Sequence, residues 1–390
     1  MSAASTSERY VLLGLRLGRH VDGLVDAYYG PEELSRQVES EPVAEPQALV
    51  ADAEALLDGL EDGWLRDQTV GLRTYAGVLA GEELVYSDEV EGCYGVRPAR
   101  VSTDVYAAAL DQLDRLLPGS GSLMERHEAW RQSQLVPEEH VVPAVGDVAV
   151  LLRERTNAVV ELPGGEGFEL EEEHDEPWWA FNYYLGGLRS RVEVNVDIPT
   201  VWDDVVELAG HEIYPGHHTE HALKEQLLLR EAGRLEECIQ LVPTPAALVS
   251  EGIAEVGRAV VSDEEVLEEI ETILRSHGMA GDLSQAHAIR EARRPLRRVM
   301  LDAALLLHED GGSAEEAKSY FERWHLDTPE LAAHGVRFVS DPTWRAYAIT
   351  YSAGGELCRA WVGDDKARLA SLLTEHVRVR DLLAAVSSTT

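Results

Sequence analysis

Three histidines and one glutamate lie within eight consecutive residues, and side chains of these types can bind and use a metal ion. They are His211, Glu212, His217 and His218. In the common zinc-peptidase motif His-Glu-x-x-His, two imidazoles lie one helical turn apart and share one ion. The glutamate beside the first imidazole takes a proton from the attacking water. Here Pro215 stands where the second histidine should be, so the common spacing fails.

An unbroken helix cannot bring both ends of this stretch to one ion. Residues 217 and 218 would lie about 9 to 10.5 Å further along the helix axis than residue 211, whereas zinc ligands lie about 2 Å from the ion. Pro215 must kink or break the helix, because it lacks a backbone donor and clashes with the preceding turn. Gly216 allows the backbone angles that a bulge needs. We therefore predict a helix broken at Pro215, with His217 or His218 folded back towards His211.

The residues from 211 to 218, His-Glu-Ile-Tyr-Pro-Gly-His-His, resemble the motif His-Glu-Ala-Tyr-Pro-Gly-His-His of the DUF885 family. Members of this family are similar in fold to M32-type carboxypeptidases, which are α-helical zinc peptidases. Ser250-Glu251-Gly252 resembles the downstream Glu-Gly of the family, and the Tyr-Ser-Ala-Gly of residues 351–354 resembles its late Tyr-x-x-Gly. The resemblance covers about residues 180–360.

The resemblance implies one zinc ion bound by His211, by one of His217 and His218, and by Glu251. His217 is preferred as the second ligand, because it follows a glycine as the second histidine does in related peptidases. Three protein ligands leave one position open, as catalytic zinc requires. The site is therefore expected to be catalytic.

The resemblance also implies roles for two further side chains. Glu212 would be the general base and later the proton donor, and Tyr351 would donate a hydrogen bond to the oxyanion of the tetrahedral intermediate. A packing role is the alternative for Tyr351. By spacing alone, Glu255 lies one turn after Glu251 and could orient a ligand imidazole, although a solvated charge is favoured. His221 is expected to be exposed.

One stretch of the chain is rich in arginine: Arg290, Arg293, Arg294, Arg297 and Arg298. Arginine binds carboxylates through two parallel hydrogen bonds, so this stretch could include a clamp for a substrate carboxylate. Ion pairs with the protein's own carboxylates are favoured, because 71 acidic residues accompany only 34 Lys and Arg.

The composition excludes several classes of partner. A formal net charge of −37 repels nucleic acid and anionic membranes. We interpret it as serving solubility or a salty interior rather than attracting cationic substrates. Three scattered cysteines fit a reducing compartment. No apolar run approaches the roughly 20 residues of a membrane span and the N-terminus lacks signal-peptide features, so we expect a soluble, cytoplasmic protein.

The hydrophobic periodicity predicts a mainly α, gluzincin-like multi-helix fold with a small β-ribbon or sheet next to the metal-binding helix. We divide the chain into an N-terminal helical region, 1–156, and a metal-site catalytic region, 157–390, within one continuous fold. Residues 159–162 and 191–198 alternate as strands do. Such a ribbon could bind extended substrate by main-chain pairing or simply cover the core. Thr200 is expected to cap the helix that carries His211.

Two functions compete. The first is a zinc-dependent hydrolase that cleaves peptide or amide bonds of small substrates, in the manner of a carboxypeptidase. The second is a non-catalytic metal-binding or structural protein, with a non-peptide amidase as a further alternative. Glu212 favours the first, because a structural zinc site fills all four positions with protein ligands and needs no base. The sequence carries no signal for the oligomeric state.

Overall fold

The computed structural model describes residues 5–176 and 178–389, and most of them are helical, so the prediction of a mainly α fold is confirmed. The helices before the larger sheet are α1 (Thr6–Gly18), α2 (Glu32–Ser40), α3 (Pro46–Leu57), α4 (Trp64–Leu79), α5 (Tyr86–Tyr94), α6 (Thr103–Leu116), α7 (Leu123–Ser133) and α8 (Glu138–Asn157).

The first helix shows how the sequence sets these elements. The Ser5 hydroxyl accepts a hydrogen bond from the Glu8 amide, and the Glu8 carboxylate accepts one from the Ser5 amide, which satisfies donors at the helix start. The apolar residues at helical spacing continue beyond this helix to Val25. α1 nevertheless ends at Gly18, and β1 (Val25–Tyr28) pairs antiparallel with β5 (Ile239–Leu241), which brings the N-terminal region against the region that follows residue 156.

The larger sheet has three strands in the order β2 (Gly167–Glu173), β4 (Arg189–Asn195) and β3 (Ala180–Gly186). β2 runs parallel to β4, and β3 runs antiparallel to it. β2 is rich in glutamate, and its Glu169 and Glu171 form diagonal ion pairs with Arg189 and Arg191 of β4. Opposite charges on the neighbouring strand offset the repulsion among the carboxylates of β2.

The strand predicted at residues 159–162 is wrong. This segment follows the end of α8, and the amides of Val159 and Val160 both donate to the Thr156 carbonyl. Four alternating residues are too few to distinguish a strand from the frayed end of a helix. The second predicted strand, 191–198, is found as β4 and ends earlier, at Asn195.

The chain after the sheet is again helical. The elements are α9 (Trp202–Leu208), the π-helical η1 (Ala209–Ile213), α10 (His217–Lys224), η2 (Glu225–Glu231), η3 (Leu235–Cys238), α11 (Pro245–Val261), α12 (Glu264–Ser276), α13 (Leu283–Arg293), η4 (Arg294–Arg297), α14 (Arg298–His308), α15 (Ala314–Trp324), α16 (Pro329–Ser340), η5 (Arg345–Ile349), η6 (Thr350–Gly354), α17 (Gly355–Val362), α18 (Lys366–Thr374) and α19 (Val379–Thr389).

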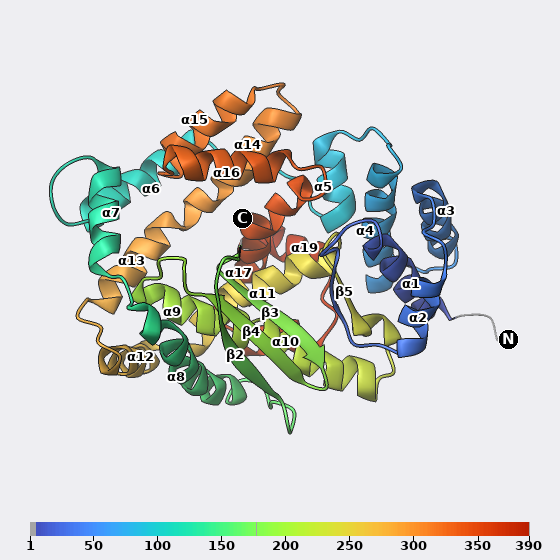
Figure 1. Ribbon diagram of the computed structural model, residues 1–390, viewed down its shortest axis with the longest axis horizontal. Helices are drawn as coiled ribbons and strands as arrows, with labels where there is room; N and C mark the ends of the chain where they lie inside the picture. The colour runs from blue at the N-terminus through green and yellow to red at the C-terminus, as the bar shows by residue number, and fades with distance from the viewer. Residues whose placement is uncertain (1–4, 177, 390) are drawn as a thin grey trace.

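The sheet lies near the middle of the molecule with α10 beside it, and α11 crosses behind (Figure 1). One cluster of buried apolar side chains extends from Tyr10 in α1 to Leu382 in α19. The core therefore includes side chains of both predicted regions. Within the described residues, none of the helices has the length and apolar character to cross a membrane.

Candidate metal centre

The helix that carries His211 breaks where the sequence predicts. α9 passes into the π-helical turn η1, Tyr214 is extended, a cis peptide bond joins Tyr214 to Pro215, and α10 begins at His217. π-helical turns inside α-helices are frequent at functional sites. Thr200 does not cap this helix as expected: its hydroxyl donates to the Ile198 carbonyl, and the Asp204 carboxylate instead accepts from the Val201 amide.

Gly216 allows the chain to return alongside η1. A Cβ atom at this position would lie only 1.7 Å from the His211 carbonyl oxygen, so no other residue fits without displacing the backbone. The close approach places the start of α10 next to His211, and the two imidazole centroids of His211 and His217 lie 4.8 Å apart. The break therefore brings the two histidines together.

His211, His217 and Glu251 form one group of potential metal ligands, in which one donor atom from each residue lies within 4.8 Å of the other two. The Nε2 atoms of His211 and His217 lie 3.7 and 3.8 Å from the two carboxylate oxygens of Glu251. Donors about 2 Å from a tetrahedral zinc ion lie roughly 3.3 Å apart, so the spacing suits a single ion after small shifts. Two imidazoles and one carboxylate are also a common donor set of catalytic zinc.

The imidazole of His217 is held by a chain of buried groups. Its Nδ1 lies 3.1 Å from the Ser250 hydroxyl, which donates to the Glu220 carboxylate at 2.6 Å. Lys224 donates to the other oxygen of Glu220, also at 2.6 Å. Burial lowers the pKa of His217, but the nearby carboxylates of Glu251, Glu212 and Glu220 raise it by more. The contact of Nδ1 with Ser250 leaves Nε2 on the side of Glu251, an arrangement that outer partners produce in metal sites.

Glu251 is held from the C-terminal part of the chain. The Tyr347 hydroxyl donates to its Oε1 at 3.0 Å. Next to it, α11 and η6 touch through backbone atoms, because a Cβ at Gly252 would lie 2.5 Å from the Gly354 carbonyl oxygen and one at Gly354 would lie 2.4 Å from the Leu248 carbonyl oxygen. The glycines of both short motifs therefore serve the same crossing, which places Tyr351 near Glu251.

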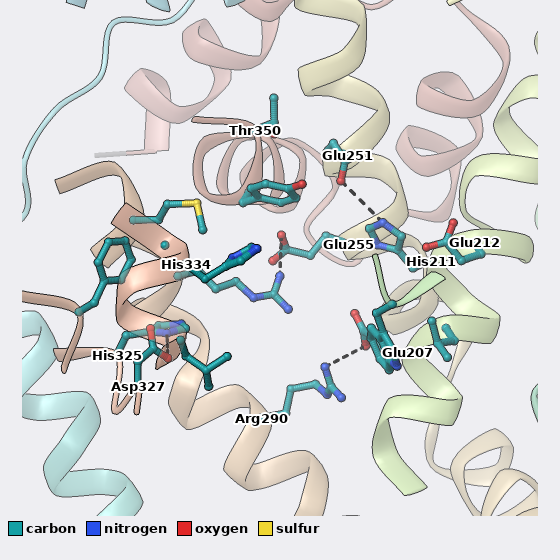
Figure 2. Close-up of a pocket in the computed structure, with 18 residues that line it drawn as sticks. Glu207, His211, Glu212, Glu251, Glu255, Arg290, His325, Asp327, His334 and Thr350 are labelled. Atoms are coloured by element: carbon teal, nitrogen blue, oxygen red, sulfur yellow. Dashed lines mark hydrogen bonds and ion pairs between the residues drawn. The ribbon is translucent and has the colours of Figure 1, made fainter. Parts of the chain in front are cut away.

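Glu212 and Tyr351 lie at the junction of two cavities. Cavity 1, of about 470 Å³, and cavity 2, of about 380 Å³, share four lining residues: His211, Glu212, Glu251 and Tyr351. Within the described part of the chain, the Glu212 carboxylate has no hydrogen-bond partner, while its backbone carbonyl accepts from the Asn182 amide at 2.6 Å. Figure 2 shows His211, Glu212 and Glu251 on one side of cavity 1, with His325 and Asp327 across from them.

Tyr351 is 41% exposed, and this exposure is to the two cavities that it lines. Protein surrounds these cavities, so the ring still loses much of its hydration. Burial and the carboxylates of Glu251 and Glu212 raise the pKa of its hydroxyl above the ordinary value, so the group stays protonated and can donate a hydrogen bond at neutral pH.

The structure does not bring His218 to the metal group. Its Nδ1 lies 2.8 Å from the Ser190 hydroxyl and its Nε2 lies 2.9 Å from the Glu166 carboxylate, in a fully buried position. Tyr214 and Arg153 also donate to Glu166, which completes a set that we call the Glu166 network: Arg153, Glu166, Ser190, Tyr214 and His218. His218 as a metal ligand is therefore corrected, because both of its nitrogens are already engaged elsewhere.

Charge in the Glu166 network is well compensated. Burial alone would raise the pKa of Glu166, but hydrogen bonds from His218, Tyr214 and Arg153 lower it to about 2.

His221, expected to be exposed, is in fact buried and lines cavity 2. Burial lowers its pKa to about 3, so its imidazole is neutral at pH 7.

Most of the remaining predicted side chains form ion pairs with charged groups of the protein itself. Glu255 lies 2.9 Å from Arg297 and 3.5 Å from Arg359, so it does not orient a ligand imidazole. Arg290 forms ion pairs with Asp203 and Asp204. Arg294 and Arg298 pair with Glu291 and Glu356. Arg293 differs, because its guanidinium contacts His127 and forms no ion pair among the described residues.

Several groups around the metal centre were not predicted. Ser250 and Glu220 orient His217, Tyr347 holds Glu251, and Asp26 of β1 lines cavity 2. Glu220 follows His217 by three residues, so helical spacing could have suggested it. The position of Asp26 depends on the β1–β5 pairing, which has no local signal in the sequence.

Asp26 is in an unusual electrostatic position. Its side chain is exposed and lines cavity 2. Burial raises the pKa of Asp26 to about 6; His217 opposes this effect, while Glu251 and Glu212 add to it.

Neither a model of a known protein family nor a curated protein matches this chain in sequence. The crystal structure of the putative lipoprotein from Colwellia psychrerythraea is similar in fold, with a TM-score of 0.55 and 17% sequence identity. The match covers 100% of this chain and 68% of that one. At this identity, the likeness concerns the fold alone.

Proposed function

We propose that this protein is a zinc-dependent hydrolase that cleaves peptide or amide bonds of small substrates. One observation carries the proposal: His211, His217 and Glu251 converge from separate elements, and the carboxylate of Glu212, unpaired among the described residues, lies beside them at the junction of two cavities. The motif that resembles the DUF885 family supports the same function. From this motif we also propose that the ion is zinc and that the chain belongs to that family.

Each side chain has a defined task in this proposal. His211, His217 and Glu251 would hold the ion, and a bound zinc ion would supply Lewis-acid polarisation of the substrate carbonyl. Glu212, which has no side-chain partner in the described part of the chain, accepts a proton from water and later delivers it to the leaving amine. The protonated hydroxyl of Tyr351 donates a hydrogen bond to the carbonyl oxygen as negative charge develops on it.

A purely structural metal site is the competing function, and the donor set argues against it. Structural zinc sites are closed by four protein ligands. Among the described residues, only three donors meet at this position, and the remaining side faces the two cavities. A non-peptide amidase would use the same groups, so the substrate scope is a matter for experiment.

The test combines metal analysis with a peptide library. Purified protein should contain about one zinc per chain and should cleave members of a mixed tripeptide library at neutral pH, read by mass spectrometry. Glu212→Gln should keep the zinc and lose turnover by about 10²- to 10⁴-fold, because general-base catalysis contributes that much. A protein without metal, or a Glu212→Gln variant as active as the original, would contradict the proposal. Zinc-loaded protein that cleaves no peptide but hydrolyses other amides would favour the amidase.

A further inference from the structure

Cavity 2 contains an acidic side chain that the proposed chemistry does not use. Asp26 lines this cavity together with the metal group, and it interacts electrostatically with His217, Glu251 and Glu212. Across the residues that the structure describes, its carboxylate forms no hydrogen bond or ion pair. An unpaired carboxylate on the wall of a cavity can accept charge-assisted hydrogen bonds from a cationic group of a ligand.

The position of Asp26 is set by an irregularity in the pairing of β1 with β5. In the pairing of β1 with β5, Val25 faces Leu241 and Ala27 faces Gln240, so Asp26 is the extra residue of a bulge. Bulges are frequent next to active sites, where they redirect a side chain. Gln240 and Leu241 line the same cavity, so the bulge lies in its wall.

The charges of cavity 2 favour a cation in addition to the metal. A divalent ion offsets the carboxylates of Glu212 and Glu251, and that of Asp26 remains. Among the described lining residues there is no lysine or arginine. Cavity 1 differs, because its arginines, Arg290 and Arg297, already pair with carboxylates of the protein.

The residues that line cavity 2 also include unpaired polar atoms and aromatic rings. Asn182 Oδ1 and His221 Nδ1 are buried without a hydrogen-bond partner in the described structure, and both residues line the cavity. Its aromatic side chains are Trp178, Phe181, Tyr347 and Tyr351. An ammonium group has three donors and no acceptor, and it is attracted to aromatic faces. It is therefore the ligand group that this wall suits.

We infer that cavity 2 is a subsite for the free ammonium group of the substrate, with Asp26 as its anchor. This inference rests on the hydrolase proposed above, and it specifies which end of the substrate lies next to the cleaved bond. We call this the polarity of the site. The substrates carry a free amine close to the cleaved amide, as the N-terminal residue of a short peptide does. This polarity is opposite to the carboxypeptidase-like one that the sequence resemblance implies.

The test compares matched substrates and matched variants. The substrates are a tripeptide library with free N-termini and the same library N-acetylated. The original protein should cleave the free forms about 10- to 100-fold faster, because a charge-assisted hydrogen bond is lost on acetylation. Asp26→Asn should slow the free forms by a similar factor and leave the acetylated forms within about twofold. Asp22→Asn, on the exposed turn before β1, should change neither.

Binding gives a readout that is independent of turnover. In the Glu212→Gln background, calorimetry should show Ala-Ala-Leu binding about 10-fold or more tightly than N-acetyl-Ala-Ala-Leu, and Asp26→Asn should remove the difference. Equal binding of the two peptides, including no binding of either, would overturn the inference, and so would an Asp26→Asn variant that slows free and acetylated substrates equally. If the original protein hydrolyses nothing but the binding difference is present, the hydrolase fails and the ammonium site stands.

Discussion

His217 and His218 are neighbours in sequence, but they belong to two regions with different tasks. His217 faces His211 and Glu251 at the edge of a cavity, and His218 is buried in the Glu166 network. Adjacent helix residues point about 100° apart, so one turn of α10 can serve two sides. Tyr214 and His218, on either side of Pro215, both bind Glu166. The Glu166 network therefore fastens the break that brings His217 to His211.

The largest effect should come from removing the metal-facing histidine. His217→Ala should reduce zinc to less than about a tenth of an ion per chain and hydrolysis by more than about 100-fold, since even an outer partner of a ligand contributes 10- to 100-fold. The free energy of unfolding of the metal-free protein should fall by only about 1–2 kcal/mol. Elemental analysis and urea unfolding measure the two quantities. A variant that keeps its zinc would remove His217 from the metal centre.

In the Glu166 network we expect the reverse, a large loss of stability and no loss of zinc. Glu166→Ala should lower the free energy of unfolding by about 3–5 kcal/mol, because it leaves buried donors without their charged partner. Zinc content of the fraction that stays folded should be retained. Glu169→Gln, exposed on β2, is the matched control and should change stability by less than about 0.5 kcal/mol. Equal effects of the two substitutions would show that the network adds no stability.

A smaller effect should follow from releasing the His217 imidazole. Ser250→Ala removes the hydroxyl between His217 and Glu220, and zinc affinity should fall about 10- to 100-fold, measured by competition with a chelator. Ser276→Ala, at the exposed end of α12, should leave the affinity unchanged. Unaltered affinity in Ser250→Ala would mean that the ring is held by its packing alone.

The smallest effect concerns acid stability. The pKa of Glu166 lies near 2 in the folded protein, below its ordinary value of 4.5, so its contribution is present above about pH 4.5 and is lost as the pH falls towards 2. Glu166→Gln cannot titrate, so its stability should fall less steeply over this window, by up to about 1.4 kcal/mol per pH unit. Urea unfolding between pH 5 and pH 3 measures both slopes, and parallel slopes would contradict the assignment.

The sequence predicts the break at Pro215 because proline and glycine act locally on the backbone. It also predicts the helices, since their apolar spacing reflects one buried face each. The choice between His217 and His218 depends on which face of α10 meets α11 and which meets the sheet. That is decided by distant residues such as Glu166 and Ser250, which the local pattern does not contain.

The errors at the sequence level have related causes. Residues 159–162 alternate like a strand but follow a helix end, and Val25 continues a helical pattern but pairs with β5. In both places the segment is too short for the spacing of its apolar residues to distinguish a helix from a strand, and tertiary contacts determine the structure. Asp26 was missed for the same reason.

The crossing of α11 and η6 at Gly252 and Gly354 determines how tolerant the site is to change elsewhere. Because backbone meets backbone there, the separation of the two segments does not depend on the size of any side chain between them. Apolar residues of the surrounding core can therefore be substituted during evolution while the relative position of Tyr351 and Glu251 is preserved. Enlarging either glycine is the exception, because it would move a hydrogen-bond donor away from the metal centre without touching a metal ligand.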